Sequence, residues 1–197
     1  MKVLNVGGGN KKIAIPAHYA DWDHVLLDIQ EGEGVDVVCN AVDMADKLEP
    51  KMYDSIYSSH NLEHHYRHNL PKLFDGFKHV LKDAGFVEIH VPNMQSVFEH
   101  CASGKDIEDI AYVSAAGPIR YVDMIYGLGS MIDENNGFMS HHNGFTAKSL
   151  GNLFFQVGFK YVYVGINHDA MSLIGFAFMQ KPTDELMEIL KLKDEIL

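Results

Sequence analysis

The sequence predicts an α/β fold, with a mostly parallel sheet and helices on both faces, from two observations. Apolar, β-branched segments alternate with helix-like segments as far as residue 91, which is the order of a parallel sheet with crossover helices. The first segment, residues 3–6, runs directly into Gly7, Gly8 and Gly9. Consecutive glycines let the chain turn sharply at the carboxyl end of a strand, where open α/β sheets bind nucleotide-like ligands.

Seven segments are predicted as strands, and the last two are expected to form an antiparallel pair at one edge. Between the first and second strands, Pro16 interrupts the sequence, so we expect only a short or irregular helix there. The predicted strands are residues 3–6, 25–29, 35–39, 53–58, 86–91, 161–164 and 173–179.

The longer helices are predicted from their capping residues and apolar spacing. Pro71 suits a first helical turn, and apolar residues then recur at helical spacing until Gly85 ends the helix. Thr146 is the expected N-cap of a second helix, which Gly158 ends. A last amphipathic helix is predicted over residues 183–197.

Residues 93–145 form a long excursion after the fifth strand. Their number exceeds the length of ordinary loops, and loops of this length are often functional. Helical pieces are predicted within it, around residues 95–101, 107–112 and 119–126. We interpret the excursion as a lid or substrate-binding insert of one domain that spans residues 1–197.

The composition argues against several classes of partner. The chain of 197 residues has a net charge of −11, and Arg67 and Arg120 are its only arginines. Nucleic acids and anionic membranes attract clustered lysine and arginine, so we predict neither as a partner. Cys39 lies in an apolar run, as expected of a buried thiol in a reducing compartment. We expect a cytoplasmic protein without a signal peptide, with a homodimer left open.

The glycine-rich loop predicts an adenosine-type ligand. A dinucleotide fingerprint needs a third glycine, and Lys12 occupies that position, which argues against a pyrophosphate. Asp28 ends the second strand, 21 residues after Gly7. This is about the spacing at which a carboxylate meets the hydroxyl groups of a ribose.

Five motifs occur in the order and at the spacing of one known protein family. Each motif alone is weak, but the combination is specific. The motifs are Gly7-Gly8-Gly9, Asp28 after the second strand, Asp43 after the third, residues 53–64 with their Leu-Glu-His, and residues 81–93 around the fifth strand.

With these motifs the chain resembles the class I S-adenosylmethionine-dependent methyltransferases, in the broad group of small enzymes with a "type 11" core. The resemblance covers residues 1–91 and returns at residues 144–179. It implies a Rossmann-like methyltransferase fold, with a mostly parallel seven-stranded sheet that has one antiparallel strand and an insert after strand five.

The resemblance also implies S-adenosylmethionine as the cofactor. The glycines would wrap its methionine part, Asp28 would hold the ribose hydroxyls, and Asp43 would meet the adenine amino group. The family usually has an acid where Asn5 stands, so a methyltransferase-like protein that binds the cofactor without catalysis is the alternative. The predicted cofactor-binding residues are Asn5, Gly7, Gly8, Gly9, Asp28, Ile29, Asp43, Ser59 and His60.

Catalysis is predicted to use histidine, because methylation of a hydroxyl or an ammonium group requires a base. The candidates are His60, directly after strand four, and the pair His141 and His142. Glu63 is expected to be buried and hydrogen-bonded beneath them. We predict O- or N-methylation of a small molecule, which Asn61, Arg120 and Tyr126 would contact.

Two other functions follow from the same residues. His60, His64 and His68 are four residues apart, which is a metal-ligand spacing on a helix, so a metal-assisted methyltransferase is an alternative. The resemblance extends to a subset of the family that binds a divalent metal with acids and histidines, and it would imply His60, Glu63 and His64 here, with His141 or His142 as a distant ligand. Because the Leu-Glu-His segment occurs in many methyltransferases of this group without metal, we predict no tightly bound metal. A nicotinamide-dependent oxidoreductase is the remaining alternative, and Lys12 argues against it.

Overall fold

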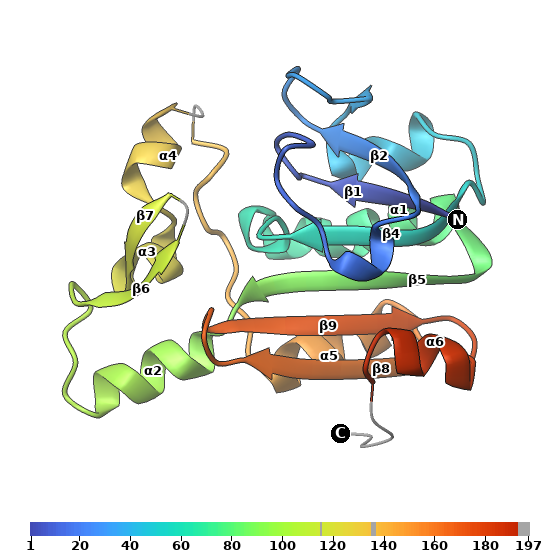
Figure 1. Cartoon of the computed structure of the whole chain (residues 1–197). Coiled ribbons are helices and arrows are strands. Elements are labelled where there is room, and N and C mark those ends of the chain that lie inside the picture. The colour runs from blue at the N-terminus through green and yellow to red at the C-terminus, as the bar shows by residue number, and fades with distance from the viewer. Residues whose placement is uncertain (115, 135–136, 193–197) are drawn as a thin grey trace.

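The structure is a computed structural model that describes residues 1–114, 116–134 and 137–192. Within these residues a seven-stranded sheet has the order β3-β2-β1-β4-β5-β9-β8 (Figure 1). All strands are parallel except β9, so the predicted sheet with one antiparallel strand is confirmed. The strands are β1 (Lys2–Val6), β2 (Asp23–Asp28), β3 (Val37–Val38), β4 (Tyr53–Ser59), β5 (Leu81–Pro92), β8 (Tyr161–Asn167) and β9 (Ser172–Phe178).

The strand β1 lies in the middle of the parallel part of the sheet. Val3, Leu4 and Val6 are fully buried, as expected of apolar and β-branched residues in a strand covered on both faces. β1 pairs in parallel with β2 on one side and with β4 on the other. The carboxyl ends of these three strands therefore open at the same edge of the sheet.

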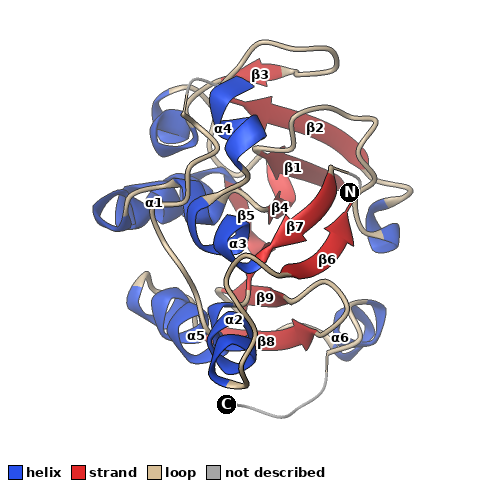
Figure 2. Ribbon diagram, turned by 90° about the vertical axis from the view of Figure 1, so that its left-hand side faces the viewer, coloured by secondary structure: helices blue, strands red, loops and turns tan. Residues whose placement is uncertain are grey.

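One face of the sheet is covered by helices α1 (Leu70–Val80) and α5 (Ala147–Gln156), which lie side by side in Figure 2, and by the 3₁₀ segment η2 (Ala41–Asp46). In α1 the buried side chains recur at helical spacing, so one side of the helix faces the sheet. The ring of Phe74 meets that of Phe154 in α5 at 5.8 Å between centroids. Among the described residues, no helix is long and apolar enough to cross a membrane.

The other face carries much less helix. Its cover consists of η1 (Ala17–Tyr19), a single 3₁₀ turn after Pro16, and α6 (Asp184–Ile189). The predicted short helix is therefore confirmed. Aromatic side chains fill this face instead, with Tyr19 and Phe86 stacked at 6.4 Å and Phe86 and Phe178 at 5.4 Å.

A buried carboxylate fastens η1 to this face. Glu88 in β5 is 2% exposed, and its two oxygens lie 2.8 Å from the Nε2 atoms of His18 and His90. Beside it, the hydroxyl groups of Tyr19 and Ser55 lie 2.8 Å apart. Burial raises the pKa of Glu88, but the hydrogen bonds from His18 and His90 outweigh it, so the pKa lies below its usual range.

Several predicted boundaries are wrong. The first long helix ends at Val80 rather than Gly85, because Leu81 is extended and pairs with Tyr53 of β4. The third strand keeps only two of its predicted five residues, since this edge strand pairs on one side alone. The last helix is capped by Thr183 but ends at Ile189, and residues 193–197 of the prediction lie outside the described residues.

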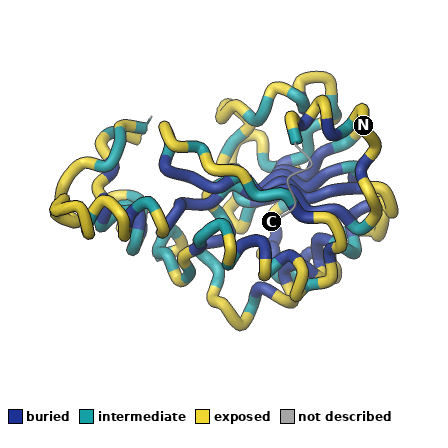
Figure 3. The backbone as a smooth tube through the Cα atoms, turned by 90° about the horizontal axis from the view of Figure 1, so that it is seen from below, coloured by how far each residue is buried: buried dark blue, intermediate teal, exposed yellow. Residues whose placement is uncertain are grey.

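The insert leaves the sheet after β5 and projects away from it (Figures 1 and 3). Most of it is exposed or half-buried, whereas the strands of the sheet are buried (Figure 3). Its two ends meet, since Asn93 and Phe145 form a parallel bridge and the N–H of Met94 donates to the Phe145 carbonyl at 2.9 Å. Its elements are α2 (Met94–Ala102), β6 (Ile110–Ser114), β7 (Gly117–Arg120), α3 (Tyr121–Tyr126) and α4 (Gly129–Glu134).

The predicted helical piece over residues 107–112 is wrong. Residues Ile110–Ser114 form a strand that pairs antiparallel with β7. The hairpin closes between Ser114 and Gly117, and the φ of Gly117 is 103°, which favours glycine. The antiparallel pairing with β7 therefore determines the structure of this segment, despite its helical spacing of apolar residues.

The buried carboxylate leads to a prediction about stability. Glu88→Gln should lower the free energy of unfolding at pH 7 by about 2 kcal/mol, because charge-assisted hydrogen bonds from two imidazoles are weakened. A depressed folded-state pKa stabilises the fold above the unfolded pKa and loses this effect as pH falls through the folded value. Urea unfolding of both proteins between pH 7 and about pH 3 should therefore show the difference shrinking in acid. A difference that is independent of pH would contradict the role given to this carboxylate.

Candidate functional site

The three glycines form a loop at the carboxyl end of β1. Gly7 has a φ of 72°, and its N–H donates to the carbonyl of Leu27 in β2 at 2.8 Å. A Cβ atom on Gly7 would lie 2.1 Å from Nδ2 of Asn61, and one on Gly8 would lie 2.3 Å from Nδ2 of Asn5. The loop therefore leaves bare backbone between two amide side chains, where a larger residue does not fit.

Asp28 holds this loop in place. Its Oδ2 accepts the N–H of Gly9 at 3.0 Å, and its Oδ1 accepts the N–H of Gln30 at 3.0 Å. Each carboxylate oxygen has a second lone pair, so Asp28 can accept two further hydrogen bonds. The structure thus brings together the glycine loop and the acid that the sequence spacing singled out.

Asn5 supplies a free acceptor at the base of the loop. It is 2% exposed, and its Oδ1 has no hydrogen-bond partner in the part of the chain that the structure describes. Its Nδ2 lies 3.2 Å from Nε2 of His24. An unpaired buried amide oxygen, bare glycine backbone and a carboxylate with spare lone pairs fit the ammonium and hydroxyl donors of S-adenosylmethionine.

The remaining predicted cofactor residues border the same edge of the sheet. Ile29 follows β2 and is 41% exposed, and Ser59 ends β4. Asp43 lies in η2, after β3, and its Oδ1 accepts a hydrogen bond from Nζ of Lys72 at 2.5 Å. The Asp43 carboxylate is therefore engaged by a lysine that the sequence pattern did not identify.

Directly after β4, a buried carboxylate lies below a half-exposed imidazole. The φ of His60 is 48°, and its Nδ1 lies 3.3 Å from Oε1 of Glu63. Glu63 is 1% exposed as predicted, but within residues 1–114, 116–134 and 137–192 neither of its oxygens accepts a hydrogen bond, so the predicted hydrogen bond is wrong there. Burial lowers the pKa of His60, and the Glu63 carboxylate outweighs this and raises it.

The end of the insert is hydrogen-bonded to the segment that carries Glu63, which is η3 (Leu62–His64). The N–H groups of His142 and Asn143 donate to the carbonyl of Glu63 at 2.7 and 3.1 Å. The side chain of Asn143 also donates to the carbonyl of His65. These bonds hold the returning chain over the carboxyl end of β4.

Two further imidazoles meet beside Glu63. Nδ1 of His64 lies 3.1 Å from the carbonyl of Ser140, and Nδ1 of His141 lies 2.9 Å from that of Met124. The two rings are 4.9 Å apart between centroids. Burial lowers the pKa of His141 and raises that of Glu63, but His60, His64 and His141 together hold the pKa of Glu63 below its usual value.

The other predicted catalytic and substrate residues are less closely grouped. The ring of His142 stacks on Tyr66, 4.0 Å between centroids, and His142 is exposed. Arg120 is also exposed, and its guanidinium pairs with Glu108 of the insert at 3.2 Å. Tyr126 is 64% exposed at the end of α3. Of the three predicted catalytic histidines, the structure brings His60 and His141 to the same carboxylate.

Asn61 belongs to the cofactor side of the site rather than to the substrate side alone. Its amide lies against Gly7, and its Oδ1 is 3.2 Å from Nε2 of His65. Neither this contact nor the orientation of His64 and His141 by backbone carbonyls leaves a signature in sequence. The spacing of His60 and His64 and the Leu-Glu-His segment are the sequence signals that point to the cluster.

A hollow lies farther along the sheet from the glycine loop. It has a volume of about 520 Å³ and lies between α5 and β8, lined by Thr146, Phe155, Val162 and Ile166 among others. Because β9, β5 and β4 separate β8 from β1, this hollow is not part of the glycine-loop site.

Comparison with known proteins agrees with this geometry. A family model described as "Methyltransferase domain" matches residues 1–164. A search of curated proteins gives no match. The predicted resemblance and the predicted cofactor, S-adenosylmethionine, are confirmed.

Solved structures with the same fold include three methyltransferases. The CMeT domain of the citrinin polyketide synthase has a TM-score of 0.58 at 12% identity, over 92% of this chain and 47% of the other, so this chain spans about half its length. A SAM-dependent methyltransferase from Archaeoglobus fulgidus has a TM-score of 0.56 at 13% identity, over 89% and 85%. The 1,6-didemethyltoxoflavin-N1-methyltransferase of Burkholderia thailandensis, solved with that compound and S-adenosylhomocysteine, has a TM-score of 0.54 at 12% identity, over 89% and 69%.

The position of Asp28 predicts its contribution to binding. Asp28→Ala should weaken S-adenosylmethionine binding by about 1.5–3 kcal/mol, because hydrogen bonds to a charged acceptor are lost and the glycine loop loses its support. Titration calorimetry should show a rise in Kd of roughly 10- to 100-fold. Asp21→Ala, an exposed acid outside this site, is the matched control and should bind as the wild type does. Wild-type affinity in Asp28→Ala would refute the assignment.

Proposed function

Because the chain belongs to the methyltransferase domain family, we propose that it transfers the methyl group of S-adenosylmethionine to an oxygen or nitrogen atom of a small molecule. The observation that carries this proposal is the pairing of two features at one sheet edge. The glycine loop with Asp28 follows β1 and β2, and the His60–Glu63 pair follows β4, which is next to β1.

The residues of the loop hold the cofactor. S-adenosylmethionine supplies an activated methyl group on a sulfonium. Asn5 offers its unpaired Oδ1 to a donor group, and Gly7 and Gly8 allow the backbone to approach the ligand closely. Asp28 accepts hydrogen bonds from the ribose hydroxyl groups, and Ile29 and Asp43 border the adenine.

His60 acts on the acceptor. Methyl transfer mainly requires alignment in a closed site, but a hydroxyl or an ammonium group must also lose its proton. The His60 ring is half-exposed at the end of β4, and the carboxylate of Glu63 raises its basicity from below. His60 therefore takes the acceptor proton, and Glu63 is a positioning residue for the imidazole.

The insert forms the wall that closes the site. Its returning segment is hydrogen-bonded to η3, and Met124 and Ser140 orient the imidazoles beside Glu63. A wall placed over the end of β4 excludes water and limits the size of the acceptor. Tyr126, at the end of α3, borders this wall and contacts the acceptor.

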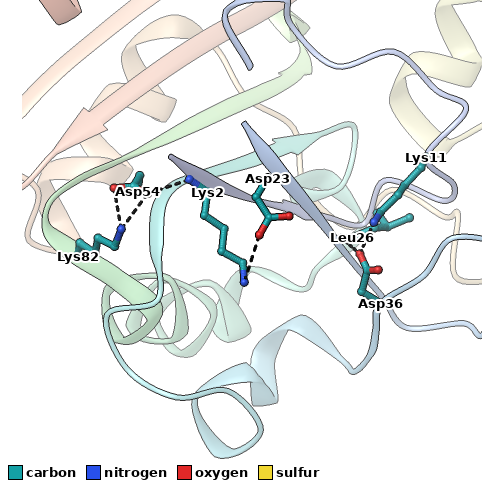
Figure 4. A network of polar contacts seen from close by, with 7 residues as sticks. All are labelled: Lys2, Lys11, Asp23, Leu26, Asp36, Asp54 and Lys82. Carbon is teal, nitrogen blue, oxygen red and sulfur yellow. Dashed lines mark hydrogen bonds and ion pairs between the residues drawn. The ribbon is translucent and has the colours of Figure 1, made fainter. Parts of the chain in front are cut away.

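The charges of the protein favour a small acceptor over a nucleic acid. Figure 4 shows Lys2, Lys11 and Lys82 paired with aspartates, and their Nζ atoms lie 3.5, 2.7 and 2.9 Å from a carboxylate oxygen. Arg120 is paired with Glu108. Lysine and arginine side chains that are held by carboxylates in a chain of net charge −11 do not make a phosphate-binding surface.

Turnover of the cofactor tests the function directly. Purified protein should convert S-adenosylmethionine to S-adenosylhomocysteine in the presence of a small hydroxyl or amine compound from a panel of both classes. His60→Ala should lower kcat by about 100-fold or more with that compound, because the base is lost while the cofactor site is intact. Cofactor binding without turnover on any acceptor class would instead favour the non-catalytic alternative, which Asn5 and the reduced η1 motivate.

A matched pair of glycine variants controls this experiment. Gly7→Val should abolish cofactor binding and turnover while the protein still folds, since the new side chain would overlap Asn61. Among the described residues outside its own helix backbone and chain neighbours, no atom lies within 4 Å of a Cβ added to Gly129, at the start of α4. Gly129→Ala should therefore behave as the wild type does. Loss of binding in both variants would indicate a general effect on folding.

The insert should respond to ligands. When S-adenosylhomocysteine and an acceptor bind together, backbone hydrogen exchange in residues 121–134 and 137–143 should slow by about 10-fold or more, because the wall closes on the acceptor. Hydrogen exchange followed by mass spectrometry measures this, with α6 as the reference segment. Unchanged exchange throughout the insert would assign it to contact between chains instead.

A further inference from the structure

Three hydrogen-bond acceptors face one another beside the end of β4. They belong to Glu63 and His64 of η3 and to His141 of the returning insert, and one ligand atom of each lies within 4.8 Å of the others. The three side chains come from segments that are almost eighty residues apart, yet the hydrogen bonds between η3 and residues 140–143 hold them together.

The hydrogen bonds of the two imidazoles determine which atoms face the cluster. A carbonyl oxygen can only accept, so Nδ1 of His64 donates to Ser140 and Nδ1 of His141 donates to Met124. In the neutral form of each ring, this leaves Nε2 as the nitrogen with a lone pair that can bind a ligand. Backbone carbonyls orient metal-binding histidines in this same way.

The carboxylate between them is buried. Glu63 is 1% exposed, and neither Oε1 nor Oε2 accepts a hydrogen bond within the described residues. Its nearest basic neighbour, Nδ1 of His60, is 3.3 Å away. A buried carboxylate that lacks hydrogen bonds is costly, and buried charges are ordinarily paired or bound to a metal.

We infer that Glu63, His64 and His141 bind a divalent transition-metal ion. Two imidazole nitrogens and one carboxylate oxygen suit Zn²⁺, Mn²⁺, Fe²⁺ or Co²⁺, whereas Mg²⁺ and Ca²⁺ prefer oxygen ligands. This inference departs from the expectation, based on sequence, that no metal is tightly bound. The basis is a buried carboxylate that accepts no hydrogen bond within the described residues, together with the orientation of the two rings by backbone carbonyls.

The ligand atoms need only a small movement to reach coordination distance. Metal–ligand bonds of about 2.1 Å place tetrahedral ligands roughly 3.4 Å apart, so a cluster within 4.8 Å closes by rotation of the side chains. Three protein ligands leave at least one position for water or another oxygen. His142 is not part of the set, because its ring stacks on Tyr66.

The ion would connect the insert to the sheet. Glu63 and His64 follow β4, whereas His141 comes from the insert, so the metal fixes the wall of the site to its floor. If the proposed methyl transfer holds, the open position lies where an acceptor oxygen could bind. The binding of the metal itself does not depend on that function.

Metal binding is measured without cofactor or acceptor. The whole chain is stripped with a chelator and titrated separately with Zn²⁺, Co²⁺, Mn²⁺ and Mg²⁺, followed by elemental analysis after desalting, by the absorption of the Co²⁺ form and by thermal unfolding. We expect about one transition-metal ion per chain, a visible Co²⁺ spectrum and a raised Tm, with no comparable effect of Mg²⁺.

Three variants locate the site. Glu63→Gln keeps the shape of the side chain and removes its charge, so the chain should fold and its affinity for Zn²⁺ should fall by about 100-fold or more. His141→Ala should have the same effect, and His142→Ala, its exposed neighbour, should bind as the wild type does.

Several results would overturn the inference. These are the absence of a bound ion in the wild type, binding that is unchanged in both Glu63→Gln and His141→Ala, or a response to Mg²⁺ alone. Because none of these measurements uses S-adenosylmethionine, failure of the metal site and failure of the methyltransferase activity are separate outcomes.

Discussion

The parallel pairing of β1 with β2 on one side and β4 on the other brings the glycine loop, Asp28 and His60 to one edge of the sheet. Parallel strands end at a common edge, so the loop after β1, the acid after β2 and the histidine after β4 lie close together although they are far apart in the sequence. The hydrogen bond from Gly9 to Asp28 and that from His60 to the carbonyl of His90 in β5 then fix these loops to neighbouring strands. A shift in this register would separate the cofactor groups from the imidazole and the carboxylate.

The two faces of the sheet are stabilised by different means. On one face, α1 and α5 bury phenylalanine rings in the usual manner of helix on sheet. On the other, Pro16 prevents a long helix, and stacked aromatic rings with a bridged carboxylate take its place. A central strand accommodates Glu88 because two imidazoles satisfy its oxygens, which illustrates how a buried charge is tolerated when it is fully hydrogen-bonded.

Sequence patterns predicted the sheet, its antiparallel strand and the glycine loop with Asp28, because local periodicity and fixed spacing determine these features. They failed where pairing with another segment of the chain determines the secondary structure. Leu81 leaves the helix because it pairs with Tyr53, and residues 110–114 form a strand because a hairpin is available. In the site, Glu63 was expected to be hydrogen-bonded, but whether a buried oxygen finds a donor depends on side chains and carbonyls from the insert, which spacing along the chain does not specify.

The bridge between Asn93 and Phe145 has a consequence for how such a protein diversifies. When the two ends of an insert are paired, its length has little effect on the stability of the sheet, because the entropic cost of closing a loop rises slowly with the number of residues. The insert is therefore a separate module, joined to the sheet at a closed pair of residues. Another segment in place of residues 94–144 would change the wall of the acceptor site, while the glycine loop and its strands kept their geometry. Acceptor specificity could therefore change without a change in the sheet.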